Sequence, residues 1–306
     1  MVGLGSIGTR HLKNLFSVAE ERGLSVEIDV LRSSERPLPH GVEELISSVF
    51  YSYDDLSNDY DIAFITNPTA FHFDSVTQML SKTRHIFIEK PVFDRADYDI
   101  ESLPWNEGGI YYVACPLRYH SVIKYLKEFV QKQQVYSVRC ICSSYLPDWR
   151  TGVDYRESYS ANVELGGGVR RDIIHEWDYL LHLFGMPSEV CCEYGKFSHL
   201  DITSEDSAVY VAKYSDKLVS LHLDYFGCHS RREIELFIAD DVVVGDLVGN
   251  QVRFLKSGEV ISLPQERDVM QQEELGCFLD MIEGKVENWN DITSAVRTLR
   301  IALGDS

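Results

Sequence analysis

Residues 2–8 read VGLGSIG, and this G-x-G-x-x-G turn constrains the fold more than any other feature of the chain. Apolar residues at helical spacing follow it over residues 7–21, Gly23 supplies a helix stop, and an apolar strand pattern runs over residues 26–31. A glycine turn that leads into a helix and then a strand indicates a βαβ unit, whose helix N-terminus faces a pyrophosphate. The alternative interpretation is that the glycines serve only a tight turn.

The strand that should precede this turn is short. Only Met1 and Val2 stand before Gly3, whereas an average strand has about five residues. Either the start codon is placed too late or the central strand of the sheet is unusually short.

The strand and helix patterns predict two domains. Over residues 1–117, strands alternate with helices, which predicts a doubly wound parallel (Rossmann) sheet. Over residues 118–306, long alternating strands between helical patterns predict an α+β domain with an open, mainly antiparallel sheet. The later strands of the first domain are expected at 62–66, in the run that ends at Lys90, and at 110–114, with a helix at 73–81. In the second domain we expect helices at 122–131, 271–283 and 291–303 and strands at 135–145, 190–197, 208–214, 218–225 and 234–238.

The most informative strand end reads HIFIEKPV over residues 85–92. Glu89, Lys90 and Pro91 cannot continue a buried strand, because proline lacks an N–H and lysine is rarely buried without a purpose. Ligand crevices of open α/β sheets lie just beyond the carboxyl ends of the strands. Lys90 is therefore predicted to be a reactive group, and the segment Asn67–His72 to face the same crevice.

A nicotinamide dinucleotide is the ligand that these features predict. NAD-specific domains usually carry an acidic residue after the second strand, for the ribose hydroxyls. Here Arg32, Ser33 and Ser34 follow that strand, which favours the 2′-phosphate of NADP, while Glu35 leaves NAD open and a solvated charged turn is the simpler alternative. The predicted cofactor-binding residues are Gly3, Gly5, Ser6, Ile7, Gly8, Arg32, Ser33, Ser34, Asn67, Pro68, His72, Glu89 and Lys90.

A second segment with chemical potential follows the triple glycine Gly166–Gly168. The helix expected from there to residue 184 has an apolar stripe, and Asp172 and His175 lie about 60° apart on its opposite face, with Tyr179 between them. A carboxylate beside an imidazole orients it and raises its basicity, which suits general acid–base catalysis. The alternative is an aspartate that complements the helix dipole and a surface histidine.

The composition excludes several classes of protein. A formal net charge of −19 argues against nucleic acid or an anionic membrane as partner. No apolar run is long enough to span a bilayer and no signal peptide precedes the glycine turn, so we expect a cytoplasmic protein. The seven cysteines form no CxxC pair and no array with histidine, which predicts reduced, mostly buried thiols and no metal site.

The order of these motifs along the whole chain resembles that of the Gfo/Idh/MocA oxidoreductase family. The resemblance rests on the VGLGSIG turn, the Asn67–His72 segment, the EKP strand end at Lys90 and the triple-glycine helix with Asp172 and His175. It implies an N-terminal dinucleotide-binding domain and a C-terminal domain whose open antiparallel sheet commonly makes oligomer contacts, here in a homodimer or homotetramer. It also implies reversible hydride transfer between a nicotinamide and a hydroxyl carbon, usually of a sugar or polyol.

The same resemblance assigns roles to three residues. Lys90 corresponds to the lysine that contacts the reacting hydroxyl and the nicotinamide ribose, His175 to the catalytic histidine, and Asp172 to the aspartate that follows the triple glycine. The common family pattern has four residue steps from aspartate to histidine, whereas this chain has three. Both spacings keep the pair on one helical face.

The segment Leu146–Ala161 combines arginines with aromatic residues just before the triple glycine. Arginine forks suit carboxylate or phosphate, and the arrangement resembles family members from sialic-acid and other surface-sugar pathways. We therefore expect an anionic sugar, either a sugar acid or a nucleotide sugar; ion pairs with Asp148, Asp154 and Glu157 are the alternative. The predicted substrate-binding residues are Arg118, Trp149, Arg150, Tyr155, Arg156, Tyr159 and Tyr179.

Together these features predict an NAD(P)-dependent dehydrogenase or reductase that acts on CH–OH groups. Two other functions stay open: a non-catalytic sensor of dinucleotide or sugar with the same fold, and a reductase of a non-sugar carbonyl or imine. The presence of Lys90, Asp172 and His175 argues against the sensor, and the segment rich in arginine and aromatic residues argues against the second enzyme.

Overall fold

The computed structural model describes residues 1–150 and 152–305 and divides into two compact units. Unit 1 consists of Met1–Ala114 and Asp268–Arg297, and unit 2 of Cys115–Arg267 and Thr298–Ser306. The first division falls close to the predicted boundary at residue 117. The contiguous second domain predicted over residues 118–306 is wrong for residues 268–297, which return to unit 1. Residues 151 and 306 of that predicted domain lie outside the described residues.

Unit 1 is built on a parallel sheet whose central position is held by a single residue. Val2 forms parallel bridges to Leu31 on one side and to Ile65 on the other. The resulting order, β2–β1–Val2–β3–β4–β5, is that of a Rossmann sheet, so the predicted parallel sheet is confirmed. Its strands are β1 (Asp29–Leu31), β2 (Ser48–Phe50), β3 (Tyr60–Ile65), β4 (Thr83–Ile88) and β5 (Tyr111–Val113).

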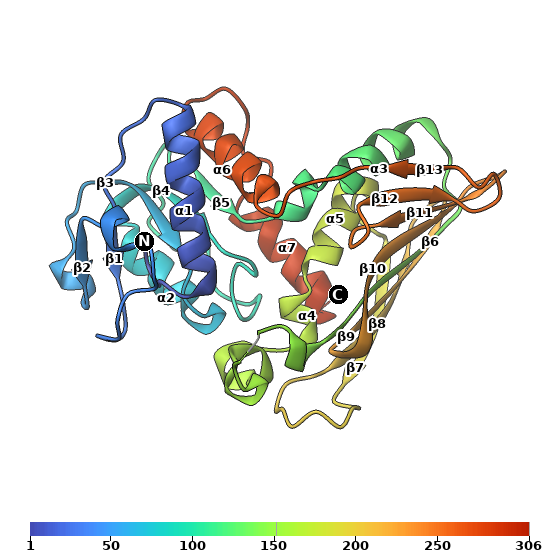
Figure 1. Cartoon of the computed structure of the whole chain (residues 1–306), viewed down its shortest axis with the longest axis horizontal. Coiled ribbons are helices and arrows are strands. Elements are labelled where there is room, and N and C mark those ends of the chain that lie inside the picture. Colours follow the sequence, from blue (N-terminus) through green and yellow to red (C-terminus); the bar gives the residue numbers. More distant parts are fainter. Residues whose placement is uncertain (151, 306) are drawn as a thin grey trace. The chain divides into compact units, whose positions relative to one another are not determined.

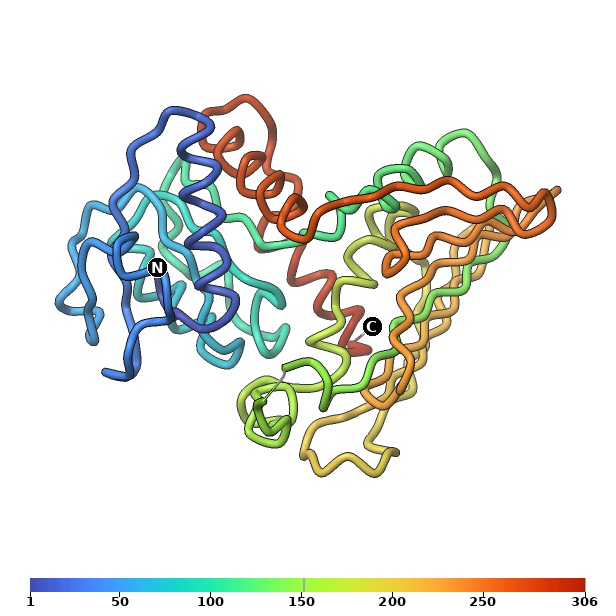
Figure 2. The backbone as a smooth tube through the Cα atoms, in the orientation of Figure 1, coloured from blue at the N-terminus to red at the C-terminus, as the bar shows by residue number. Residues whose placement is uncertain are grey.

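The helices of unit 1 bury residues that recur every three or four positions. On α1 (Ser6–Glu21) these include Leu12, Leu15 and Val18. α6 (Val269–Ile282) lies beside α1 (Figures 1 and 2), and its Phe278 ring meets that of Phe87 in β4 at 5.4 Å. This aromatic packing explains why residues 268–297 belong to unit 1. The other helical elements are α2 (His72–Met79), η1 (Glu43–Leu45), η2 (Tyr53–Asp55) and η3 (Thr69–Phe71).

Unit 2 is built on an open, mainly antiparallel sheet, as the sequence predicted (Figure 1). Its strand order is β13–β12–β11–β10–β6–β9–β8–β7, in which the pair β6–β9 is parallel. The strands are β6 (Ser137–Tyr145), β7 (Glu189–Gly195), β8 (Ser207–Lys213), β9 (Leu218–Asp224), β10 (Phe226–Phe237), β11 (Val242–Asp246), β12 (Gln251–Phe254) and β13 (Val260–Ser262). Sequence analysis missed β11–β13, and β2 in unit 1, because short runs between turns carry little periodicity.

Helices cover one face of this sheet. On α5 (His175–Phe184), Trp177 is fully buried and meets the ring of Tyr210 in β8 edge-on at 5.3 Å. α3 (Ser121–Lys132) lies against β11, where Gly245 leaves room for Leu126. The other helical elements of unit 2 are α4 (Val169–Asp172), η4 (Pro116–Tyr119), η5 (Leu146–Asp148), η6 (Tyr155–Glu157), η7 (Tyr159–Ala161) and η8 (Val163–Leu165). The first half of α7 (Ile292–Leu303) belongs to unit 1 and its second half to unit 2.

The helix predicted after the triple glycine is interrupted. α4 ends at Asp172 and α5 begins at His175, with Ile173 and Ile174 in a turn between them. The N–H groups of Ile174 and Glu176 bond carbonyls three residues back, instead of the four of an α-helix. The prediction that Asp172 and His175 share one face of an uninterrupted helix is therefore wrong.

Candidate functional site

The glycine turn of unit 1 has the geometry that a close approach to the backbone requires. Gly3 has φ +89°, and a Cβ on it would lie 2.7 Å from the Asn67 nitrogen. A Cβ on Gly8 would lie 2.8 Å from Oγ1 of Thr66 and still closer to the carbonyl of Gly3. A Cβ on Gly5, in contrast, would meet nothing within 4 Å. The fold itself therefore requires Gly3 and Gly8, whereas Gly5 leaves open space in front of the turn.

α1 begins directly behind that space. Within the described residues, no side chain caps its N-terminus and its first turn carries no acidic residue. A helix N-terminus with unclaimed N–H groups and a partial positive charge is suited to bind phosphate. Gly5, Ser6 and Ile7 therefore fit the pyrophosphate of a dinucleotide.

The residues after β1 bring positive charge to the position that distinguishes ribose hydroxyls from a phosphate. Arg32 is half-buried and lies 3.4 Å from the carbonyl of Pro37, while Ser33 and Ser34 are exposed. In the same loop, the Lys13 ammonium of α1 would lie 3.9 Å from a Cβ on Gly41. Arg32 is therefore the cation that directly follows β1, whereas Lys13 lies beside Gly41, further along the same loop.

His72, which the sequence placed at the cofactor, ties two strand ends together. It is buried, its Nε2 lies 2.9 Å from the carbonyl of Asn67, and its Nδ1 lies 3.0 Å from that of Pro91. Burial lowers the pKa of His72, and the neighbouring carbonyl groups oppose this effect. The imidazole therefore holds the turn after β3 beside the turn after β4. Asn67 is itself anchored to Ser75 at 2.8 Å, and Pro68 is exposed.

Lys90 lies half-buried at the carboxyl end of β4, before a cis peptide bond to Pro91. The preceding Glu89 is buried and uses both oxygens: Oε1 lies 2.5 Å from Nε2 of His11, and Oε2 accepts the backbone N–H of Lys90 at 3.0 Å. Burial raises the pKa of Glu89, but His11 and Lys90 together outweigh burial, so that the net shift is downward. A buried carboxylate therefore fixes the backbone that carries Lys90.

Sequence reasoning missed His11. It lies on the buried face of α1, four residues before Leu15, and its ring packs edge-on against Phe87 at 5.0 Å. The sequence did contain a signal: His11 is a titratable residue at a position of the helix that its apolar periodicity assigns to the buried face.

In unit 2, the triple glycine forms a close-packed turn in front of α4. Gly168 has φ +130°, and a Cβ on it would collide with the carboxylate of Glu205. Glu205 accepts from Nε of Arg170 at 3.1 Å and lies 3.8 Å from Nη1 of Arg171. Arg170 also donates to the carbonyl of Leu303 at the end of α7. This ion-pair network anchors the turn from which Asp172 projects.

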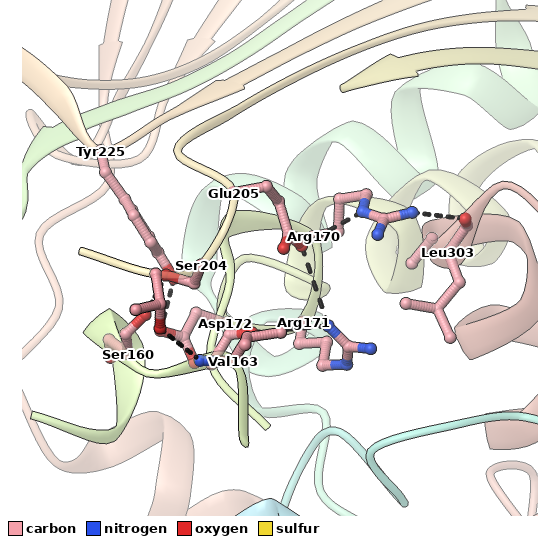
Figure 3. A network of polar contacts seen from close by, with 12 residues as sticks. Ser160, Val163, Arg170, Arg171, Asp172, Ser204, Glu205, Tyr225 and Leu303 are labelled. Carbon is pink, nitrogen blue, oxygen red and sulfur yellow. Dashed lines mark hydrogen bonds and ion pairs between the residues drawn. The ribbon is translucent and has the colours of Figure 1, made fainter. Parts of the chain in front are cut away.

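Asp172 is buried and engaged by phenols (Figure 3). Tyr225 donates its hydroxyl to Oδ2 of Asp172 at 2.6 Å. Burial raises the pKa of Tyr159 well above its ordinary value, and the nearby charge of Asp172 raises it further. The aspartate that the sequence paired with His175 thus acts on two tyrosines, whereas His175 begins α5 beyond the turn.

Two buried ion pairs hold α5 behind His175. Glu176 is fully buried and accepts from Nε of Arg232 at 2.6 Å. Arg118 donates two hydrogen bonds to Asp178, from Nη2 to Oδ1 at 2.7 Å and from Nε to Oδ2 at 3.0 Å. Burial raises the pKa of Asp178, and Arg118 opposes the increase. Arg118, predicted to bind substrate, therefore forms an ion pair within the core of unit 2.

Tyr179 is placed in the same core. Its side chain is fully buried, and its hydroxyl lies 2.8 Å from Sγ of Cys140 in β6. Burial raises the pKa of Tyr179 well above its ordinary value. The predicted substrate contact of this residue is replaced by packing between α5 and the sheet.

Trp149 and Arg150 retain exposed side chains in the predicted substrate segment. Trp149 is 40% exposed and its Nε1 donates to Oγ of Ser144 at 3.0 Å. Its ring stands edge-on to that of Tyr225 at 5.2 Å, while the Arg150 guanidinium lies 5.8 Å from the centre of the Tyr159 ring. A hollow of about 10 Å³, roughly the space of one water molecule, lies against the segment. It is lined by Leu146, Pro147, Trp149, Arg150, Val153, Tyr155, Ser158 and Ser160.

Arg156 is engaged by acidic residues. It forms a two-point ion pair with Asp154, with contacts of 2.5 and 2.9 Å, and lies 3.8 Å from Asp201. This arginine lowers the pKa of Asp154. The hydroxyl of Tyr155 accepts the N–H of Asp201 at 3.1 Å. For Asp154 and Arg156, the structure therefore matches the ion-pair alternative.

Among residues 1–150 and 152–305, no helix is both long and apolar enough to cross a membrane. No group of three or more His, Cys, Asp or Glu side chains in the same ranges is placed to hold a metal ion.

A glycine turn on a parallel sheet, joined in the chain to an open antiparallel sheet, defines a Rossmann-type dinucleotide-binding protein of two units. Residues 1–100 match the family model described as oxidoreductase family, NAD-binding Rossmann fold, and residues 123–240 match that of the GFO/IDH/MocA C-terminal domain. The chain belongs to the Gfo/Idh/MocA oxidoreductase family, as its motifs predicted.

Individual relatives are more distant. The uncharacterized oxidoreductase YrbE of Bacillus subtilis (strain 168) is 27% identical over 202 residues, which are 64% of this chain and 55%, about half, of that protein. UDP-N-acetylglucosamine 3-dehydrogenase GnnA from Acidithiobacillus ferrooxidans shares the fold with a TM-score of 0.77 and 20% identity over 99% of this chain and 94% of that one. The WlbA dehydrogenase from Bordetella pertussis, solved with NADH and UDP-GlcNAcA, has a TM-score of 0.78 and 15% identity, covering 100% and 96% of the two chains.

Proposed function

We propose that this protein catalyses NAD(P)-dependent hydride transfer between a nicotinamide and a hydroxyl or carbonyl carbon of a sugar, sugar acid or nucleotide sugar. The observation that carries the proposal lies within unit 1. The open turn at Gly5 follows Val2, and Lys90 follows β4. Val2 and β4 both pair with β3 in the same parallel sheet, so the turn and Lys90 lie at its carboxyl edge. Such an edge is where α/β sheets bind their ligands.

The proposed chemistry divides the work between two side chains. In the oxidation direction, a bound nicotinamide would accept the hydride that leaves the hydroxyl carbon. His175 would take the hydroxyl proton while the carbon–oxygen double bond forms, because an imidazole exchanges protons near neutral pH. Lys90 would stabilise the negative charge that develops on the same oxygen. In the reverse direction, His175 would return the proton.

We propose NADP as the preferred cofactor, with NAD as the alternative. Arg32, Ser33 and Ser34 follow β1 directly. A guanidinium with two hydroxyls suits a 2′-phosphate better than a pair of ribose hydroxyls. The WlbA structure was solved with NADH, so both cofactors belong in the assay.

We propose an anionic sugar or nucleotide sugar as the substrate class. In this chain of net charge −19, Arg150 places an exposed guanidinium next to the exposed indole of Trp149. A guanidinium recognises carboxylate or phosphate, and an indole offers an apolar face to a sugar ring.

We also propose that the protein assembles as a homodimer or homotetramer through unit 2. Val209 and Val211 of β8 and Leu218 of β9 are exposed on the sheet face opposite to the buried Tyr210. Exposed apolar side chains on neighbouring strands are typical of protein–protein contacts.

The decisive experiment compares wild type with Lys90→Ala. The purified protein is mixed with NAD⁺ or NADP⁺ and either UDP-N-acetylglucosamine or UDP-GlcNAcA, a pair that tests the value of an added carboxylate, and nicotinamide absorbance is followed. We expect turnover, faster with UDP-GlcNAcA. Lys90→Ala should reduce it by about a hundredfold or more, with dinucleotide affinity roughly unchanged.

Lys285→Ala removes an exposed lysine of the same unit and serves as the matched control. Unchanged turnover in Lys90→Ala would contradict the proposed mechanism. Dinucleotide binding without turnover on any sugar would favour the sensor instead.

A further inference from the structure

The substrate segment of unit 2 rests on two tyrosines. Trp149 packs edge-on against Tyr225 at 5.2 Å, with the ring planes at 87°. Arg150, the next residue, lies over the ring of Tyr159. The two exposed side chains proposed to meet the sugar therefore each have a tyrosine beneath them.

Both tyrosines converge on Asp172. Tyr225 is fully buried and donates to Oδ2 at 2.6 Å, and the same carboxylate lies close enough to Tyr159 for its charge to raise the pKa of that phenol. Burial raises the pKa of both phenols well above the ordinary value, as does the negative charge of Asp172. Each phenol therefore keeps its proton at neutral pH, and a neutral phenol has one hydrogen to donate to the carboxylate.

The backbone of the segment is held close to the same point. A Cβ on Gly167 would collide with the carbonyl of Tyr159, so the triple-glycine turn packs directly on η7. Ser204 donates to the carbonyl of Ser160 at 2.7 Å, and the N–H of Leu146 bonds the carbonyl of Tyr225 at 2.8 Å. Figure 3 shows Asp172, Tyr225 and Ser160 gathered beside the Arg170–Glu205 network that anchors the turn.

We infer that Asp172 is a positioning residue for substrate recognition: by holding Tyr225, it sets the place of Trp149 and, with it, of the adjoining Arg150. This inference deepens the proposed function and rests on it for the identity of the ligand. It differs from a role in orienting His175, because it assigns the effect of Asp172 to sugar affinity and not to proton transfer.

The test uses Tyr225→Phe as the main variant, because it removes one hydroxyl and preserves the ring under Trp149. Asp172→Asn is the second variant, and Tyr214→Phe is the matched control, since the Tyr214 hydroxyl donates to the carbonyl of Gly185 elsewhere in unit 2. Loss of a hydrogen bond to a charged group corresponds to about tenfold or more in an equilibrium constant.

For Tyr225→Phe we therefore expect the KM for UDP-GlcNAcA to rise about tenfold, with kcat, its pH profile and dinucleotide affinity unchanged. Amide hydrogen exchange over residues 146–161 should accelerate by about the same factor. Asp172→Asn should act in the same direction, and Tyr214→Phe should change neither readout.

Two results would overturn the inference. One is a KM and an exchange pattern in Tyr225→Phe that match the control. The other is a shifted pH profile of kcat in Asp172→Asn at constant KM, which would assign Asp172 to His175. If no sugar is turned over, the proposed function fails, but faster exchange in Tyr225→Phe and Asp172→Asn would still support the positioning of the segment.

Discussion

Removing the imidazole of His11 tests whether the buried histidine–carboxylate pair of His11 and Glu89 fixes the strand end that carries Lys90. His11 is fully buried, with its Nε2 2.5 Å from Oε1 of Glu89, whose other oxygen accepts the Lys90 N–H. The substitution His11→Leu keeps an apolar side chain against Phe87 but leaves the Glu89 carboxylate buried without its imidazole. The change therefore removes one partner of the pair with little change in packing.

The expected loss of stability is large. Breaking a buried pair by removing one partner costs about 3–5 kcal/mol. In a unit the size of unit 1, each kcal/mol shifts the melting temperature by about 2–4 °C, so we expect a decrease of roughly 6–20 °C. Because Glu89 also binds the Lys90 N–H, turnover should fall in the same variant.

The loss should depend on pH in a defined direction. In the wild type, the net pKa shift of Glu89 is downward, because His11 and Lys90 outweigh burial, the largest single effect. Such a carboxylate stabilises the fold above its unfolded-state pKa and loses this contribution as pH falls through the folded-state pKa. In His11→Leu, burial should raise the pKa of Glu89 instead. The difference between the two proteins should therefore be largest at neutral pH and shrink on acidification.

Calorimetry at several pH values provides the measurement, because it resolves separate transitions in a chain of two units. Glu89→Gln and the double variant complete a cycle that isolates the pair. His40→Leu changes an exposed histidine of the same unit and should cost less than about 0.5 kcal/mol. A loss no larger than that of the control, or one independent of pH, would refute the reasoning.

Two further predictions concern the glycine turn and the acid limit of stability. Gly5→Ala should leave the melting temperature unchanged but weaken dinucleotide binding, because its Cβ enters open space; Gly8→Ala should destabilise unit 1 by about 1–3 kcal/mol, because its Cβ meets backbone. Equal melting temperatures of these two variants would contradict the geometry. Burial, with Arg232 adding to it, lowers the pKa of His120 to about 4, so the folded state binds fewer protons than the unfolded state and stability should fall between pH 6.5 and about 4. His120→Asn retains a side-chain cap for the Val122 N–H, and its free energy of unfolding should depend less on pH over this range. Urea titrations at several pH values measure this dependence, and the same dependence in the variant as in the wild type would argue against the assignment.

Local patterns predicted the positions of many elements. The glycine turn, the apolar runs of β3 and β4 and the position of Lys90 after β4 all follow from residues within a few positions of one another. Interrupted patterns were less informative. The turn at Ile173 and Ile174 contains neither glycine nor proline, so the helical period continued through it and predicted a single helix.

Local sequence patterns are sufficient to predict a Rossmann-type unit followed by an open antiparallel sheet, because helical and strand periods record which face of each element is buried. The partners of the buried polar groups, in contrast, become known only from the folded chain. His11 and Glu89 are 78 residues apart, Arg118 and Asp178 60, and Asp172 and Tyr225 53. No local period relates such positions, since a buried charge or hydroxyl takes whichever partner the packing of distant elements brings within hydrogen-bond distance.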